Sequence, residues 1–407
     1  MASNDHARLD ELQRDPYPLY ARARRAEGLT FVPELDAWLV ARNADVREVL
    51  RRSDDFSSAH ALLPDVLPSP DALEVLAKGY GKRPTVVSTD GPAHQRHRAP
   101  LNRGLSAARI AALVPYATEC AEALVGTFEA DGRAELMAAY ARRLPGQVIG
   151  RLLGFDPEDV PQAVHGGYRA EELLFRPLDP EEQIRAAEDV VALQRLLDQY
   201  IRNRRASPRD DLLSGLVAAL APGVGELTLD QRHELVSNVQ NLLIAGHLTT
   251  TALIGSTLLH LLRDRRQWEL IRADPALIPG AVEEAARYDT PVQGFRRTTT
   301  RPVAVAGTEL PAGATVFVAF GSANRDEDCY ERPDDFDVTR PLSRQHVAFG
   351  HGPHGCPGSQ LAREQLRLTI ELFARRLPGL RIDESKPPAV MRPTLIHRSP
   401  EALHLAW

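Results

Sequence analysis

The 407-residue sequence is poor in cysteine: it has three, Cys120, Cys329 and Cys356, and they lie far apart. Because no two of them form a Cys-x-x-Cys pair, we do not expect a zinc site, an iron–sulfur cluster or a disulfide framework. Lysine is equally scarce, with three residues, so arginine carries nearly all of the positive charge. The formal net charge of −6 gives no basic surplus for nucleic acid or an anionic membrane, and we expect the chain to bind neither.

The sequence also lacks features that would divide the chain or direct it out of the cell. We find no internal repeat and no low-complexity linker. The segment Met1–Arg14 is polar and charged throughout, unlike a signal peptide or a membrane anchor. Together with the few cysteines, this predicts a cytoplasmic protein in a reducing compartment.

One long segment has no charged side chain: Leu235–Leu262 contains no Asp, Glu, Lys or Arg. It is long enough to span a bilayer, but residues such as Asn238, Asn241 and His247 make it too polar for a membrane helix. We expect instead a long helix that is buried on most sides. Its polar groups need partners or a wet cavity, which indicates an active site beside it.

Helical periodicity dominates the remainder of the chain. We expect helices over Pro115–Phe128, with its proline in the first turn, over Glu181–Arg205, and from Pro279-Gly280 to Tyr288. Strand-like runs are short: Thr30–Pro33, Trp38–Ala41, Val303–Val305 and Thr315–Ala319. The sequence therefore predicts a mainly α fold with a small β portion.

A glycine-rich loop, Phe349–Gly358, brings Cys356 to the start of an apolar helical pattern that includes Leu366, Ile370 and Phe373. A cysteine in front of a helix N-terminus is favoured as the thiolate, because the N–H groups there carry partial positive charge. Glycines allow the loop backbone to lie flat against a large group. A thiolate held in this way suits the proximal ligand of a haem iron, where it promotes O–O cleavage.

The spacing Phe349-Gly350-x-Gly-x-His354-x-Cys356-x-Gly358 resembles the haem-binding signature of the cytochrome P-450 superfamily, in its soluble bacterial form. The resemblance runs from Pro16-Tyr17-Pro18 to the C-terminal hairpin. It implies the cytochrome P-450 fold, with haem b between a long central helix and the helix after the cysteine. It also implies a single haem-thiolate catalytic domain over residues 1–407, O2 as co-substrate, and electrons that come indirectly from NAD(P)H.

The resemblance assigns roles at the haem to positions that match the family's motifs. Cys356 would ligate the iron, and Gly350 and Gly358 would belong to the loop that binds the haem. Phe349 would pack near the thiolate and tune its donor strength, although ordinary core packing is equally compatible with its position. The two propionates of haem are anionic and partly buried, so they need cationic or hydrogen-bonding partners. The matching positions for these partners are His94, Arg98, Arg297 and His354.

Glu284 and Arg287 stand three residues apart in the Glu-x-x-Arg pattern of the family, a spacing that forms an ion pair on a helix. Arg340 resembles the third member of the family's structural triad. The resemblance implies that these three residues support the cysteine loop and retain the haem, without taking part in the chemistry.

Ala245-Gly246 and Thr249 resemble the oxygen-binding segment of the central helix. The small pair would leave room beside the iron, and Thr249 would assist proton delivery. The sequence departs from the family at Leu248, where an acid usually stands, because leucine cannot hold or relay a proton. Four explanations stay open: a water relay, a polar group of the substrate, slow and poorly coupled turnover, or a carboxylate that is dispensable here.

Segments that line the distal pocket of relatives map onto largely apolar stretches of this chain. The residues expected to contact substrate are Leu62, Leu63, Asn241, Val292, Gln293, Phe295 and Leu395. On the cysteine side, a basic patch would suit docking of an acidic electron-transfer protein: Arg96, Arg103, Arg363 and Arg367. No flavin or iron–sulfur domain is attached, so the resemblance implies a separate ferredoxin or flavodoxin-type donor.

We therefore predict a monooxygenase that inserts one oxygen atom from O2 into a small organic substrate, by analogy a secondary metabolite. Two alternatives stay open. The same haem oxidant could carry out oxidative C–C or C–N coupling or desaturation, an option that Leu248 favours. The chain could also be a catalytically silent haem-binding relative, although the joint presence of Cys356, Glu284, Arg287 and Thr249 weighs against this.

Overall fold

The computed structural model describes residues 9–64, 66–341 and 346–407, so the polar segment Met1–Arg14 is described only from residue 9 onward. The chain divides into two compact units. Unit 1 comprises Met1–Ser57, Val114–Leu144 and Thr249–Trp407, and unit 2 comprises Ser58–Leu113 and Pro145–Leu248. Helices predominate and the strands are short, which confirms the predicted mainly α fold with a small β portion.

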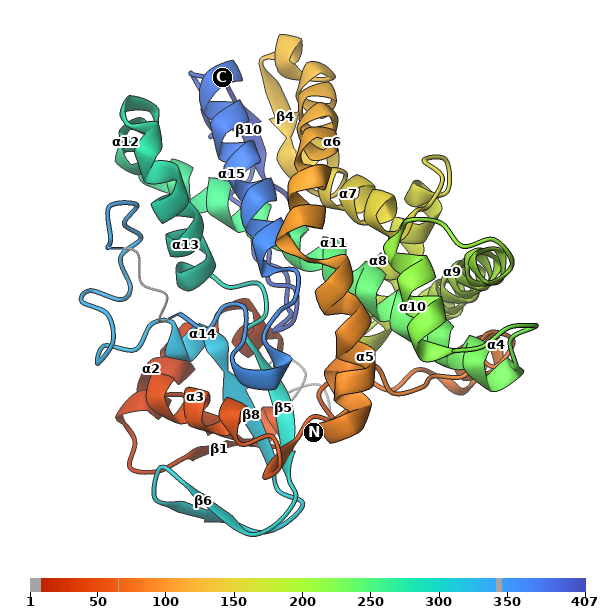
Figure 1. The fold of residues 1–407 in the computed structure, drawn as a ribbon. Coiled ribbons are helices and arrows are strands. Elements are labelled where there is room, and N and C mark those ends of the chain that lie inside the picture. Colours follow the sequence, from red (N-terminus) through yellow and green to blue (C-terminus); the bar gives the residue numbers. More distant parts are fainter. Residues whose placement is uncertain (1–8, 65, 342–345) are drawn as a thin grey trace. The chain divides into compact units, whose positions relative to one another are not determined.

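Unit 1 contains a five-stranded sheet with the strand order β1-β2-β8-β5-β3 (Figure 1). Its members are β1 (Thr30–Val32), β2 (Ala37–Val40), β3 (Phe56–Ser57), β5 (Gly294–Thr299) and β8 (Thr315–Ala319). Strands β2 and β8 pair in parallel and the other neighbours are antiparallel. Val40, Val316 and Val318 are fully buried in the core beside this sheet, as β-branched side chains in central strands commonly are.

The helices of unit 1 that bear on the site are α3 (Asn43–Arg51), α13 (Ile278–Tyr288), α14 (Phe320–Ala323) and α15 (Ser359–Arg376). Helix α13 packs on α15, and α3 packs on α14 (Figure 1). The other helices of the unit are α2 (Tyr17–Arg25) and α12 (Arg265–Ala273). Two small sheets complete it: β4 (Arg133–Glu135) with β9 (Arg381–Ile382) and β10 (His404–Ala406), and the hairpin of β6 (Val303–Val305) and β7 (Thr308–Leu310).

Unit 2 is helical. Its long helices α8 (Val160–Phe175) and α9 (Pro180–Ala206) pack closely, since a Cβ on Gly166 would lie only 2.6 Å from the Cβ of Leu193. Helix α9 begins where expected, with Pro180 in its first turn and the side chain of Asp179 accepting the N–H of Glu182. The remaining helices are α4 (Pro70–Leu76), α5 (Gly91–Gly104) and α10 (Leu212–Leu220).

Three helices begin in one unit and end in the other: α6 (Ala107–Gly126), α7 (Leu144–Leu153) and α11 (Leu229–Arg263). Helix α11 contains the uncharged segment Leu235–Leu262, and the prediction of a long helix there is confirmed. By length and composition it is the one helix in the described part of the chain that could cross a membrane, but 72% of its apolar window is buried inside the protein. It is therefore a core helix.

The start of α6 differs from the prediction. The helix begins at Ala107, so Pro115 lies inside it and not in its first turn. The residues before Pro115 are strong helix formers, including Ala111 and Ala112, and they extend the helix across the one hydrogen bond that proline cannot donate.

A close approach between the cysteine loop and α3 explains one glycine in the loop. Gly352 has a φ of +67°, and a Cβ there would lie 2.5 Å from the carbonyl oxygen of Leu50. Gly307, in the turn between β6 and β7, has a similar φ of +76° but no atom within 4 Å of such a Cβ. An alanine at Gly307 would therefore meet backbone strain alone, whereas an alanine at Gly352 would meet both backbone strain and steric overlap.

We predict that Gly307→Ala lowers the free energy of unfolding by about 1 kcal/mol, the cost of a left-handed alanine. Gly352→Ala should cost about 1–3 kcal/mol more, because its methyl group also overlaps the backbone of α3. Denaturant-induced unfolding of both variants measures this difference. Equal losses would contradict the close packing of the loop on α3.

Candidate active site

Cys356 stands between a 3-10 turn, η6 (Gly352–His354), and the first residue of α15, and it is exposed. Its N–H donates a hydrogen bond of 2.7 Å to the carbonyl of Phe349, and the N–H of Gly355 donates to the carbonyl of Gly352 at 3.0 Å. Gly350 takes a φ of +70°, which a residue with a side chain rarely adopts. These turns hold Cys356 just ahead of the α15 N-terminus, the position that the sequence predicts.

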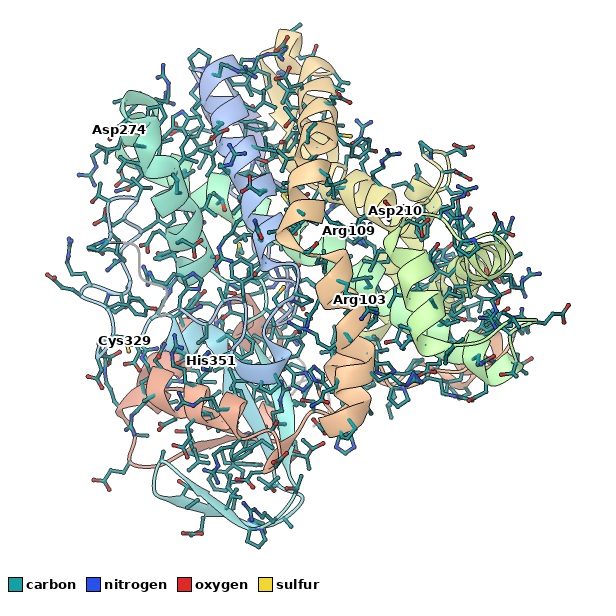
Figure 2. All side chains as sticks on the ribbon, viewed as in Figure 1. Arg103, Arg109, Asp210, Asp274, Cys329 and His351 are labelled. Carbon is teal, nitrogen blue, oxygen red and sulfur yellow. The ribbon has the colours of Figure 1, made fainter. Side chains whose placement is uncertain are left out.

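Helix α3, which also belongs to unit 1, contacts the same loop. His351, labelled in Figure 2, has its Nδ1 3.5 Å from Nη1 of Arg47. Burial lowers the pKa of the His351 imidazole, and the positive charges of Arg47 and Arg51 lower it further. The contact therefore places a neutral imidazole against an arginine at neutral pH.

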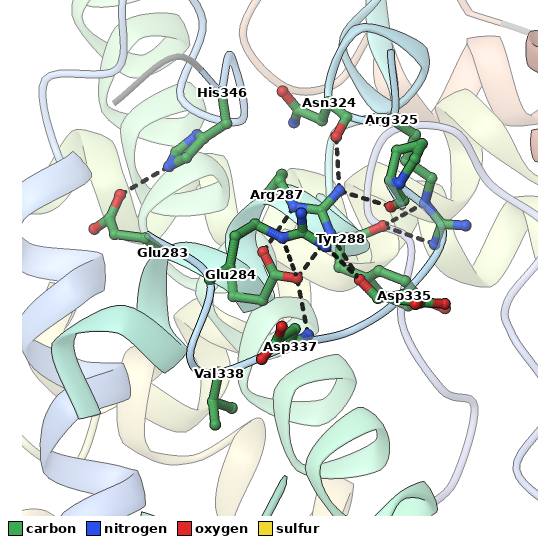
Figure 3. Close-up of polar contacts among 12 residues, drawn as sticks. Glu283, Glu284, Arg287, Tyr288, Asn324, Arg325, Asp335, Asp337, Val338 and His346 are labelled. Carbon is green, nitrogen blue, oxygen red and sulfur yellow. Dashed lines mark hydrogen bonds and ion pairs between the residues drawn. The ribbon is translucent and has the colours of Figure 1, made fainter. Parts of the chain in front are cut away.

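Glu284 and Arg287 form a bidentate ion pair on α13 (Figure 3). Nε and Nη2 of Arg287 each donate to a different oxygen of Glu284 at 2.7 Å. Nε of Arg340 donates to Oε1 of Glu284 at 3.1 Å. The three residues of the predicted triad are thus in direct contact, and Glu284 and Arg287 are 4% and 2% exposed.

The remaining N–H groups of Arg287 reach the backbone. They donate to the carbonyls of Asn324 at 2.9 Å, Pro333 at 2.8 Å and Asp335 at 3.0 Å (Figure 3). Asn324 is fully buried and continues the connection, because its Oδ1 accepts the N–H of Val347 at 2.7 Å. The triad is therefore connected through Asn324 to Val347, shortly before the cysteine loop, a role of Asn324 that the sequence pattern did not predict.

The residues predicted to hold propionates are distributed over both units. In unit 1, Arg297 is buried in β5, with its Nη1 donating to the carbonyl of Arg296 at 2.8 Å, and His354 ends the turn η6. In unit 2, His94 and Arg98 lie one turn apart on α5, as their spacing predicts. Burial lowers the pKa of His94, and the charge of Arg98 adds to this effect.

The segment predicted to bind oxygen lies within α11. Ala245 is exposed, although Leu243 and His247 on the same helix are buried. A Cβ on Gly246 would lie 2.5 Å from Cδ1 of Ile149 on α7, so the missing side chain also allows these two helices to pack closely. The role of both small residues beside the iron stays a prediction.

The residues predicted to contact substrate fall into two groups. Leu62, Asn241, Val292 and Phe295 are half-buried and Leu63 is 44% exposed, so all five keep accessible surface. Gln293 and Leu395 are buried, and a backbone hydrogen bond joins them. The N–H of Gln293 donates to the carbonyl of Leu395 at 2.7 Å, and its Nε2 donates to the carbonyl of Thr290 at 2.7 Å.

The predicted basic patch is weaker than the sequence indicates. In unit 1, Arg363 binds Glu283, and Arg367 binds Glu364 and Glu371. In unit 2, Arg96 binds Glu234. Arg103 on α5 is exposed, with no ion pair to any residue in the described ranges (Figure 2). Carboxylates therefore offset three of the four charges, and less positive charge is left to steer a partner than four unpaired arginines would supply.

The described residues fit a haem group. An exposed cysteine ahead of a helix N-terminus is the donor that a haem-thiolate iron requires. Arg297 and His94 are buried side chains of the type that binds carboxylates. Ala245 adds a small, exposed side chain in the middle of a mostly buried helix.

Comparisons with known proteins agree with this interpretation. A family model described as Cytochrome P-450 matches residues 169–405. The chain is 36% identical over 370 residues to vitamin D(3) 25-hydroxylase of Pseudonocardia autotrophica, covering 89% of this chain and 87% of that protein. It is 34% identical over 403 residues to cytochrome P-450 monooxygenase PikC of Streptomyces venezuelae, covering 97% and 91%.

Among solved structures, cytochrome P-450 CREJ in complex with (4-ethylphenyl) dihydrogen phosphate has the same fold, with a TM-score of 0.90 at 29% identity. The match covers 97% of this chain and 98% of that one. The fold and the cysteine loop are those of a haem-dependent oxygenase. The chain belongs to the cytochrome P-450 family, and like these relatives it is an oxidoreductase of the monooxygenase type.

We predict that Arg287→Met lowers the free energy of unfolding by about 3–5 kcal/mol, because it leaves the buried carboxylate of Glu284 without its partner. Haem bound per chain should fall as well, since the link through Asn324 is lost. Arg272→Met, which removes an exposed pair with Glu269, should cost less than about 1 kcal/mol. Unfolding and haem content of both variants test this, and equal effects would contradict a supporting role for the triad.

Proposed function

We propose that this chain is a haem-thiolate monooxygenase that inserts one oxygen atom from O2 into a small organic substrate, of the secondary-metabolite class. Electrons come from NAD(P)H through a separate ferredoxin or flavodoxin-type protein that docks on the cysteine side. We further propose that residues 1–407 act as a single catalytic domain in the cytoplasm. Relatives that match 97% of the chain support the assignment of one domain.

The observation that carries the proposal is the cysteine loop. Cys356 is exposed, and its N–H is held by the carbonyl of Phe349 directly ahead of α15. When bound, haem b supplies the iron at which O2 is activated, and the thiolate of Cys356 donates electron density to that iron. The cationic or imidazole side chains of Arg297, His354, His94 and Arg98 bind the propionates and so orient the group.

Thr249 is the proposed site of proton delivery, since its hydroxyl can accept a proton from water and donate one in turn. Leu248 precedes it where the family pattern has an acid, and its side chain is buried. Because leucine cannot relay a proton, we propose that the hydroxyl receives protons from ordered water or from a polar group of the substrate. Slow proton delivery favours release of reduced oxygen without product.

The proposed substrate contacts are the accessible residues Leu62, Leu63, Asn241, Val292 and Phe295. Four of these side chains are apolar and one is an amide, a composition typical of a pocket that binds an apolar molecule with few polar anchors. Gln293 and Leu395 are proposed to support these residues without touching substrate, because both are buried and are joined by a backbone hydrogen bond.

The proposal is tested by titrating the purified ferric protein with macrolides, terpenoids, aromatic amino acids and cyclic dipeptides while the Soret band is recorded. We expect one class to shift the iron from low to high spin by displacing a bound water. Product analysis with that class then separates oxygen insertion from coupling or desaturation. A protein that binds no haem, or that no ferredoxin reduces, would instead be a silent relative.

We predict that Leu248→Glu raises the fraction of electrons recovered in product, because it restores a group that relays protons to Thr249. Leu248→Gln has nearly the same shape but cannot ionise, so it should leave the fraction unchanged. Oxygen consumption, peroxide release and product are measured together for both variants. An equal rise in the two variants, or no rise in either, would show that proton supply does not limit the fraction of electrons recovered in product.

A further inference from the structure

Glu283, the neighbour of Glu284 on α13, binds two residues that flank the cysteine loop. Its Oε2 lies 2.7 Å from Nε2 of His346, which precedes the cysteine loop. Its carboxylate also accepts Nε and Nη2 of Arg363, at 2.5 and 3.0 Å, from the first turns of α15. Glu283 therefore connects α13 to one residue before the loop and one residue after it (Figure 3 shows the His346 contact).

Both partners of Glu283 also contact Phe349. The guanidinium carbon of Arg363 lies 4.3 Å from the centre of the Phe349 ring, which is within the range of a cation–π contact. The ring of His346 is 6.0 Å from the same ring. Phe349 in turn accepts the N–H of Cys356 through its carbonyl at 2.7 Å. The chain of contacts thus runs from Glu283 to the backbone of the cysteine.

The hydrogen bonds fix the proton positions in this cluster. Nδ1 of His346 accepts the N–H of Ala348 at 3.3 Å, so Nε2 carries the proton that is donated to Glu283. Burial alone would raise the pKa of Glu283, but the hydrogen bonds from His346 and Arg363, together with the charge of Arg363, outweigh it and lower the pKa to about 2. The carboxylate is therefore negative at neutral pH and offsets the charge of Arg363.

We propose that Glu283 is a positioning residue for the thiolate ligand: through Arg363 and His346 it fixes Phe349, and it neutralises the guanidinium of Arg363 that lies on this ring. The inference rests on the proposed role of Cys356 as haem ligand. It is separate from the Glu284–Arg287–Arg340 triad, because Glu283 contacts other partners. It also accounts for Arg363, which the sequence places in a docking patch.

The test is the reduction potential of the haem in Glu283→Gln. Loss of the carboxylate leaves the charge of Arg363 beside Phe349 without compensation, and positive charge favours the reduced iron. We expect a shift to more positive potential equivalent to about tenfold in the equilibrium constant for one-electron reduction, which is ~59 mV. Glu283→Asp keeps the charge and should restore most of the wild-type potential.

Glu364→Gln is the matched control. It removes the carboxylate of the residue after Arg363, which binds Arg367 and, within the described part of the chain, makes no polar contact with Phe349. Its equilibrium constant for one-electron reduction should change by less than about 1.5-fold, which is ~10 mV at ~59 mV per tenfold step. Equal shifts in Glu283→Gln and Glu364→Gln would overturn the proposal, because they would reflect net charge alone.

Should Glu283→Gln fail to retain haem, Arg363→Met carries the test. It removes the cation and leaves the carboxylate of Glu283, so the potential should move in the negative direction. An unchanged potential in this variant would overturn the inference. If the wild-type protein shows no haem-thiolate spectrum, the proposed function itself is overturned. Failure of the inference and failure of the proposed function are therefore distinguishable.

Discussion

Arg287 is a guanidinium that is 2% exposed, so each of its N–H groups needs an acceptor inside the protein. Two bonds go to Glu284 and three to the carbonyls of Asn324, Pro333 and Asp335. The backbone acceptors belong to two segments of unit 1, one at Asn324 and one at Pro333 and Asp335. The side chain of Arg287 therefore holds both segments against α13. A buried pair of this kind adds little net stability but strongly penalises other arrangements of the same segments.

Contacts with the surrounding residues of unit 1 hold the cysteine loop in its conformation. Asn324 accepts the N–H of Val347, Glu283 binds His346 and Arg363, and α3 meets Gly352 and His351. The loop itself is rich in glycine and has few side chains that could hold it. Residues around a metal ligand commonly decide its orientation and donor strength, so these outer contacts are part of the function proposed for Cys356.

The sequence was sufficient for features that depend on local spacing. The pair Glu284–Arg287 lies within one helical turn, and Cys356 follows a loop with a recognisable pattern, so both could be predicted. Contacts between distant segments could not: Glu283 and Arg363 are 80 residues apart, and nothing in their local sequence indicates that they meet. Gly246 shows the other limit, because a small residue near a site is equally compatible with room for oxygen and with packing on Ile149.

The central claim is that the sulfur of Cys356 is the axial ligand of the haem iron. X-ray absorption at the iron edge of the purified ferric protein, measured for the wild type and for Cys356→His, tests it most directly. The account predicts one sulfur neighbour at bonding distance in the wild type and none in the variant. A wild-type iron without a sulfur ligand, or a sulfur ligand that persists in Cys356→His, would contradict it.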